Sequence, residues 1–138
     1  MARPASLTAE QIAVGEFVVA NFDAGELPPD FTEADRLLSV EVAIAGAYLL
    51  DRLEDHGRSC EDIDRIMDAA SQIQAAVTMA GFRDPWPAVT AILDCERHGT
   101  RLVYDADLAS RLVRWVLARG VGRWDDPLLD ALTAAYGA

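Results

Sequence analysis

Apolar residues recur along this chain at the three- and four-residue spacing of amphipathic helices, without the strict alternation typical of half-buried strands. Ser, Thr or Asp precedes most of the apolar segments and glycine follows most of them, which are signals for helix starts and ends. The pattern therefore predicts an all-α protein, a compact bundle of about six helices forming one domain over residues 1–138.

The same signals divide the chain into helices joined by short connections, which favour antiparallel neighbours. The second helix is apolar on nearly all sides, so we expect it to be central. In the fifth helix we expect the inward side chains to be Leu108, Leu112, Val113, Val116 and Leu117. The expected helices cover residues 8 to about 24, 32–56, 59–81, 84–99, 105–120 and 126–137.

The net negative charge of the chain bears on the kind of partner that it can bind. The chain has a formal charge of −11, and all 12 of its basic residues are arginine. Residues 1–68 carry 15 acidic residues against 5 arginines, whereas residues 69–138 carry 8 against 7. Phosphate binding depends on cationic side chains that displace counterions, so this composition argues against a nucleic-acid partner.

Cysteine content and hydropathy bear on the compartment. The two cysteines, Cys60 and Cys95, are too few for a disulfide framework, and we expect a reduced, cytoplasmic protein. No apolar run approaches the roughly 20 residues of a membrane-spanning helix, so we expect no membrane partner.

Two histidine–cysteine pairs raise the possibility of a zinc site. His56 and Cys60 bracket a predicted turn, and Cys95 and His98 lie three apart near a predicted helix end. Two thiolates and two imidazoles suit tetrahedral zinc. However, at 1.5 Å per residue the fourth helix climbs less than the third, which would leave the two pairs about 10 Å apart. We therefore interpret Cys60 and Cys95 as cysteines on the apolar faces of their helices that bind no metal, and we expect no cofactor.

The stretch RLEDH, residues 52–56, resembles the arginine–histidine pair of ribonucleases of the HEPN type. The resemblance covers only these five residues, and the intervening stretch is longer in that family. It would imply phosphodiester cleavage by Arg52 and His56, but the adjoining Glu54 and Asp55 would repel such a substrate. We expect a solvated helix end instead.

An enzyme or ligand-binding bundle remains the alternative function. Glu41 is the one carboxylate within an apolar stretch, and a buried carboxylate needs a partner or a raised pKa. Such a protein, with or without a bound metal ion, would have a pocket lined by Glu41, Tyr48, His56, Cys95 or His98.

The leading hypothesis is a non-catalytic protein-interaction module, acting as a homo-oligomer or as an adaptor for another protein. The acidic first half and the arginine-bearing second half are complementary in charge. A variant is an acidic decoy that binds a basic partner and weakens steeply with salt. Because Trp and Arg dominate binding hot spots, the predicted contact residues are Trp115, Trp124, Arg111, Arg114 and Arg123.

Overall fold

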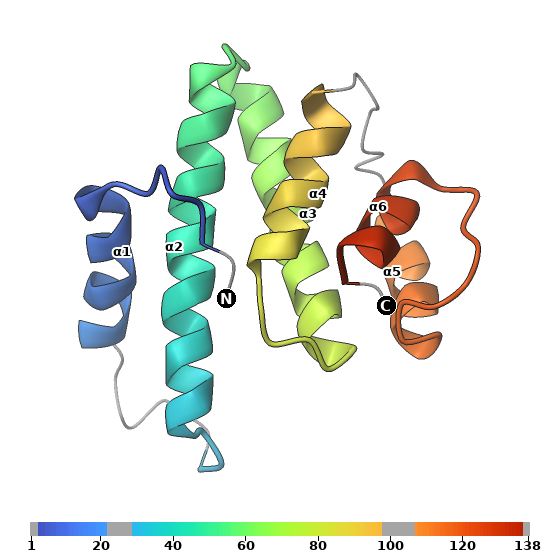
Figure 1. Cartoon of the computed structure of the whole chain (residues 1–138), viewed down its shortest axis with the longest axis horizontal. Helices are drawn as coiled ribbons and strands as arrows, with labels where there is room; N and C mark the ends of the chain where they lie inside the picture. The colour runs from blue at the N-terminus through green and yellow to red at the C-terminus, as the bar shows by residue number, and fades with distance from the viewer. Residues whose placement is uncertain (1–2, 22–28, 98–106, 137–138) are drawn as a thin grey trace.

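The computed structural model describes residues 3–21, 29–97 and 107–136, and these residues form six helices and no strand (Figure 1). The predicted all-α bundle is therefore confirmed. The expected helix ends near residues 24, 99 and 137 and the expected start at Asp105 lie outside the described residues. The helices are α1 (Ala9–Ala20), α2 (Glu33–Asp55), α3 (Cys60–Met79), α4 (Trp86–Arg97), α5 (Leu108–Leu117) and α6 (Pro127–Tyr136).

Side-chain caps set the starts of the first three helices. The Thr32 hydroxyl accepts a hydrogen bond from the Asp35 amide at 3.1 Å, and the Asp35 carboxylate accepts one from the Thr32 amide at 3.0 Å. Thr8 and Gln11 form the same reciprocal pair ahead of α1. Ser59 caps α3 through the Asp62 amide. These bonds satisfy amides that would otherwise lack partners, so the predicted starts of these helices are confirmed.

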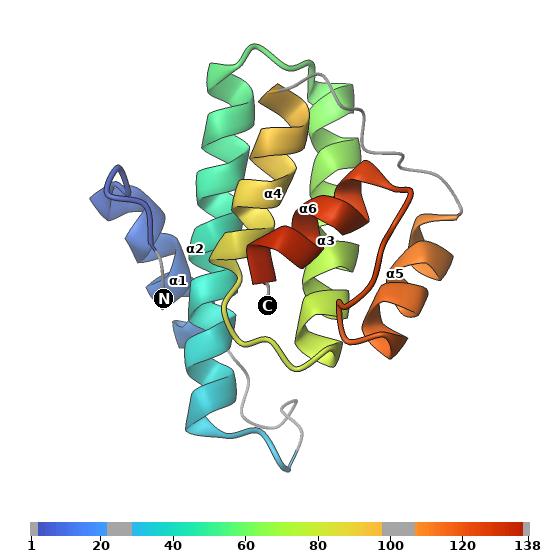
Figure 2. The same ribbon diagram turned by 45° about the vertical axis from the view of Figure 1, so that its right-hand side comes forward.

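The core lies among α2, α3 and α4, with α6 packed across α4 (Figures 1 and 2). As predicted, α2 is central: it contacts α1 on one side and α3 and α4 on the other. A contiguous cluster of aliphatic side chains is buried along these seams, and its largest fully buried members on α2 to α4 are Ile44, Leu49, Leu53, Ile73, Val77 and Ile92.

Trp115 fixes α5 and α6 to the rest of the bundle. Its side chain is 0% exposed and packs with Phe82 and Tyr136, at ring-centroid distances of 6.0 and 6.4 Å. Its indole N–H donates to the Thr133 hydroxyl at 3.1 Å, and that hydroxyl donates to the Gly120 carbonyl at 2.8 Å. These two hydrogen bonds join the last turn of α5, the turn that follows it at Gly120, and α6.

The expected inward face of α5 is only partly correct. Leu108 and Leu112 are buried, but Val113 and Leu117 are 56% and 80% exposed. Trp115 takes the inward position in their place. Successive helical residues are about 100° apart, so residues two positions before and after an inward side chain point largely away from the core.

Helix α1 contacts only α2 among the described helices, and Gly15 permits their close approach. A Cβ atom at Gly15 would lie 2.8 Å from a methylene of Ile44 and 2.8 Å from a methyl group of Val40. Gln11 adds a hydrogen bond of 2.8 Å to Asp51 on α2. The close contact between α1 and α2 therefore requires a residue without a side chain, glycine, at position 15.

Gly15→Ala should weaken this attachment. Overpacking costs about 1–3 kcal/mol, while alanine regains about 1 kcal/mol of helix propensity, so we expect a net loss of up to about 2 kcal/mol. Native-state hydrogen exchange should show the loss as reduced protection within α1. Gly46→Ala is the matched control: a Cβ there meets nothing within 4 Å, so this variant should gain up to about 1 kcal/mol. Equal stabilisation by both substitutions would contradict the close approach.

Candidate functional site

An almost wholly apolar depression lies between α3 and α5, and we term it the α3–α5 groove. Its volume is about 290 Å³. Ala76 and Leu112 are buried within it, whereas Met79, Val113 and Leu117 are exposed around it. The lining residues are Gln72, Ala75, Ala76, Met79, Ala109, Leu112, Val113, Val116 and Leu117.

Three large side chains of this groove are open to water. Met79 is 76% exposed and Leu117 is 80% exposed, which places two large apolar groups beside a surface of small alanines. A contiguous exposed apolar surface on a globular domain marks an interaction site more often than scattered single residues do. Sequence reasoning missed it because α5 was assigned a single inward face, although its apolar residues lie on both sides of the helix.

The groove is also electrically neutral. None of its lining residues is ionisable, in a chain whose formal charge is −11. A partner would therefore not have to desolvate a charged group of the groove, and two copies of the acidic chain would bring no lining carboxylates together there.

The predicted Trp–Arg contact surface does not form as expected. Trp115 is wholly buried, so its prediction as a surface anchor is wrong. Arg111 is also largely buried, and its Nε donates to Asp126 at 2.5 Å. Burial alone would raise the pKa of Asp126, but the Arg111 bond and two backbone amides hold this pKa below its ordinary value.

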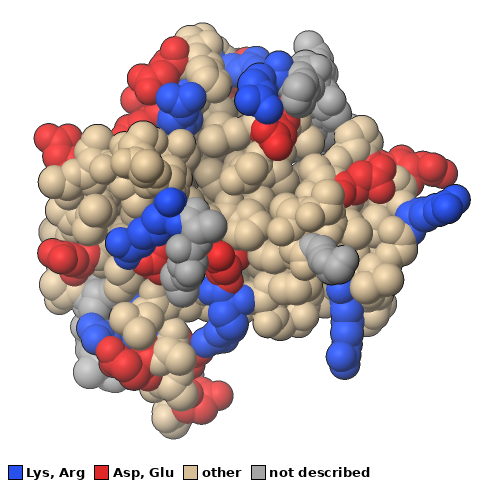
Figure 3. Space-filling model, in the orientation of Figure 1, with Lys and Arg blue, Asp and Glu red and all other residues tan. Residues whose placement is uncertain are grey.

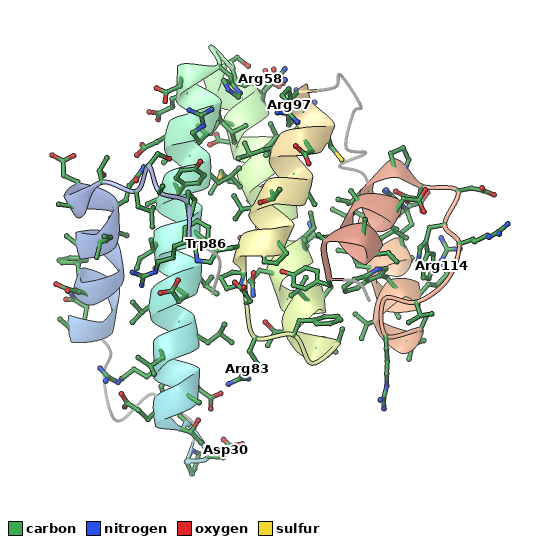
Figure 4. The ribbon with its side chains drawn as sticks, viewed as in Figure 1. Asp30, Arg58, Arg83, Trp86, Arg97 and Arg114 are labelled. Carbon is green, nitrogen blue, oxygen red and sulfur yellow. The ribbon has the colours of Figure 1, made fainter. Side chains whose placement is uncertain are left out.

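The remaining predicted contact residues differ in exposure. Trp124 is half-buried against the core. Arg114 and Arg123 are exposed, and Arg114 projects from α5 (Figure 4). Exposed apolar side chains, and not these aromatic and cationic ones, form the continuous surface at this end of the molecule.

The four predicted metal ligands fall in different settings. His56 ends α2, Cys60 is exposed at the first residue of α3, and Cys95 is buried on α4. His98 lies outside the described residues. Within the described part of the chain, no three His, Cys, Asp or Glu side chains are grouped as a metal site. Arg58 instead links the α2–α3 turn to α4, through the Glu96 carboxylate at 3.1 Å and the Glu96 carbonyl at 3.2 Å.

Glu41 is buried, and its carboxylate links three segments of the protein through hydrogen bonds. It is 6% exposed and accepts from Arg3 Nε at 2.9 Å and from the Trp86 indole N–H at 2.8 Å. Burial alone would raise the pKa of Glu41, but the hydrogen bonds from Arg3 and Trp86 outweigh it and hold the pKa below its ordinary value. The carboxylate joins the N-terminal segment, α2 and the start of α4.

The pocket predicted for a ligand-binding bundle is only partly assembled. Tyr48 and His56 do line a depression of about 380 Å³ between α2 and α4, which we term the α2–α4 pocket. Glu41 and Cys95 are not among its lining residues, and His98 lies outside the described residues. Arg52, Trp86 and Arg97, which sequence reasoning did not assign to a pocket, line it as well.

Comparison with protein-family models, curated proteins and solved structures gave no match. Among the described residues, no helix combines the length and apolarity that crossing a membrane would require. Two surface depressions, the uncharged α3–α5 groove and the α2–α4 pocket with its arginines, are the candidate binding sites.

Arg3→Ala should destabilise the fold by leaving the Glu41 carboxylate with Trp86 alone. We expect a loss of about 1–2 kcal/mol at pH 7, because the Arg3 side chain is 42% exposed and the pair is only partly desolvated. The folded-state pKa of Glu41 is lowered, so the benefit of Arg3 is complete above the ordinary glutamate pKa and disappears as pH falls through the lowered one.

Urea unfolding of wild type and variant at several pH values measures this difference. Arg36→Ala is the control, since its bond to Glu33 is exposed and within one helix. A stability difference that is the same at pH 7 and pH 3 would contradict the role of the ionised Glu41.

The two thiols should react at different rates. Burial raises the pKa of the Cys95 thiol, whereas Cys60 is exposed. Ellman's reagent at pH 7.5 should therefore modify Cys60 roughly a hundredfold faster than Cys95. The single variants Cys60→Ser and Cys95→Ser assign the phases. Slow reaction of both thiols that becomes fast after chelator treatment would instead indicate a shared metal ion.

Proposed function

We propose that this chain is a non-catalytic protein-interaction module that self-associates through the α3–α5 groove. One observation carries the proposal: Met79, Val113 and Leu117 form an exposed apolar rim around an uncharged depression. Their burial against a second apolar surface would be favourable at about 25 cal/mol per Å² removed from water. We also propose, from its two cysteines, that the protein works in the reducing cytoplasm.

The composition of the groove favours a second copy as the occupant. In a two-fold dimer the same patch faces itself, so it must provide both protruding and receiving surfaces. Met79 and Leu117 protrude, and the small residues Ala75, Ala76 and Ala109 leave space beside them. Methionine and leucine of one copy can then pack over the alanines of the other.

Electrostatics supports the same occupant. Two chains of charge −11 repel one another, so a contact between copies is most favourable where no carboxylate lines the surface. The α3–α5 groove meets that condition. Because the contact is apolar and the two chains carry like charge, we expect added salt to strengthen the dimer by screening the repulsion, whereas salt would weaken an acidic decoy bound to a basic partner.

Leu117→Glu should abolish self-association. The substitution places a carboxylate in the apolar contact and, across a two-fold axis, opposite its own copy. Sedimentation equilibrium should give twice the 15.0 kDa chain mass for wild type and a single chain mass for the variant, with dimer affinity reduced at least roughly a hundredfold. Leu117 is already 80% exposed, so thermal stability of the monomer should hardly change.

Phe17→Glu is the matched control, because Phe17 is a large apolar residue, 69% exposed, on α1. It should leave the dimer intact. Dissociation by Phe17→Glu but not by Leu117→Glu would assign the contact to α1 and contradict the proposal. A wild-type protein that stays monomeric at about 0.2 mM would also refute self-association and leave a foreign protein as the only partner for the groove.

A further inference from the structure

The α2–α4 pocket is built from matching faces of two helices that run in the same direction (Figure 1). On α2 the lining residues are Tyr48, Arg52 and His56, four residues apart. On α4 the lining residues follow one face from Trp86 to Arg97. Residues four apart lie one turn above one another, so the two helices form facing walls of a continuous depression.

One end of this pocket is aromatic and rigid. Tyr48 and Trp86 meet edge to face, with ring centroids 5.8 Å apart, and Pro4 lies beside them. The indole N–H of Trp86, the residue labelled in Figure 4, donates to the Glu41 carboxylate at 2.8 Å. An apolar or aromatic group can therefore enter against a surface that is already ordered.

The other end is cationic. Arg52 lies on α2 and Arg97 on α4, and His56 at the C-terminal end of α2 also lines the pocket. Arg97 is bonded to Asp94, which also lines the pocket, at 3.0 Å. Within the described part of the chain, Arg52 makes no ion pair. Together, Arg52, Arg97 and Asp94 give the lining one uncompensated positive charge. Figure 3 shows basic and acidic side chains near one another along the upper edge of this face.

We infer that the α2–α4 pocket binds a small organic monoanion, in which an apolar body lies against Tyr48 and Trp86 and a carboxylate binds Arg52. An unpaired guanidinium near an aromatic surface suits an organic carboxylate, because it offers two parallel N–H donors. A volume of about 380 Å³ falls in the size range of small-molecule sites. This inference is independent of the self-association proposed for the opposite groove.

The charge balance selects the type of anion. A single uncompensated arginine balances one negative charge, whereas a polyphosphate would also meet Asp94 and the negative field of the whole chain. The acidic residues beside Arg52 on α2, Asp51 and Glu54, add to that repulsion. A monocarboxylate is therefore the favoured ligand class.

Titration with matched charged and neutral probes tests the inference. The probes are 1-naphthylacetate and octanoate, each compared with its neutral amide, followed by ¹H–¹⁵N NMR at constant pH. We expect the carboxylates to shift the Trp86 indole signal and the amides of residues 48–56 and 89–97, and to bind at least about tenfold more tightly than the amides. Carboxylates that shift nothing at about 10 mM would overturn the site, as would amides that bind equally well.

Substitutions of opposite expected effect sharpen the test. Arg52→Gln should reduce carboxylate affinity at least about tenfold, whereas Asp94→Asn should increase it severalfold by releasing Arg97 and removing a negative charge. Arg36→Gln, on an exposed part of α2, is the control and should change nothing. The NMR spectra also show that each variant is folded. An unchanged affinity in Arg52→Gln, or probe shifts centred on Met79 and Leu117, would contradict the inference.

Discussion

The orientation of α5 depends on the burial of Trp115. This side chain is wholly enclosed by Phe82, Tyr136 and the C-terminal turn at Gly120. A Cβ at Gly120 would lie 3.0 Å from the indole ring, so the turn closes directly over it. Because Trp115 faces the core, Val113 and Leu117 must face water. The burial of Trp115 in the core thus accounts for the exposed apolar side chains of the α3–α5 groove.

Trp86 has a comparable role at the start of α4. Its indole is buried, and its bond to Glu41 brings α2, α4 and the N-terminal segment together. The same ring lines the aromatic end of the α2–α4 pocket. The two tryptophans therefore stabilise the bundle. By fixing the helices that carry Leu117 and Arg97, they also shape the α3–α5 groove and the α2–α4 pocket.

The fold was predictable from sequence because helix caps and apolar spacing are local signals. Thr8, Thr32 and Ser59, for example, cap the three helices that they were predicted to begin. The functional surfaces were not. Trp115 was expected outside and Leu117 inside, since an apolar pattern on two sides of a helix does not say which side the core will cover. Likewise, Arg52 and Arg97 lie 45 positions apart in sequence, and only the packing of α2 beside α4 brings them to one pocket.

The most direct test of the account is whether the exposed face of α5 contacts a second copy of the chain. An isotope-filtered NOE experiment on an equimolar mixture of ¹³C-labelled and unlabelled protein detects only contacts between copies. The account predicts intermolecular signals that join the methyl groups of Met79 and Leu117 to those of Ala75, Ala76 or Ala109. Signals that arise only from Phe17 and its neighbours on α1, or no intermolecular signals at all, would contradict it.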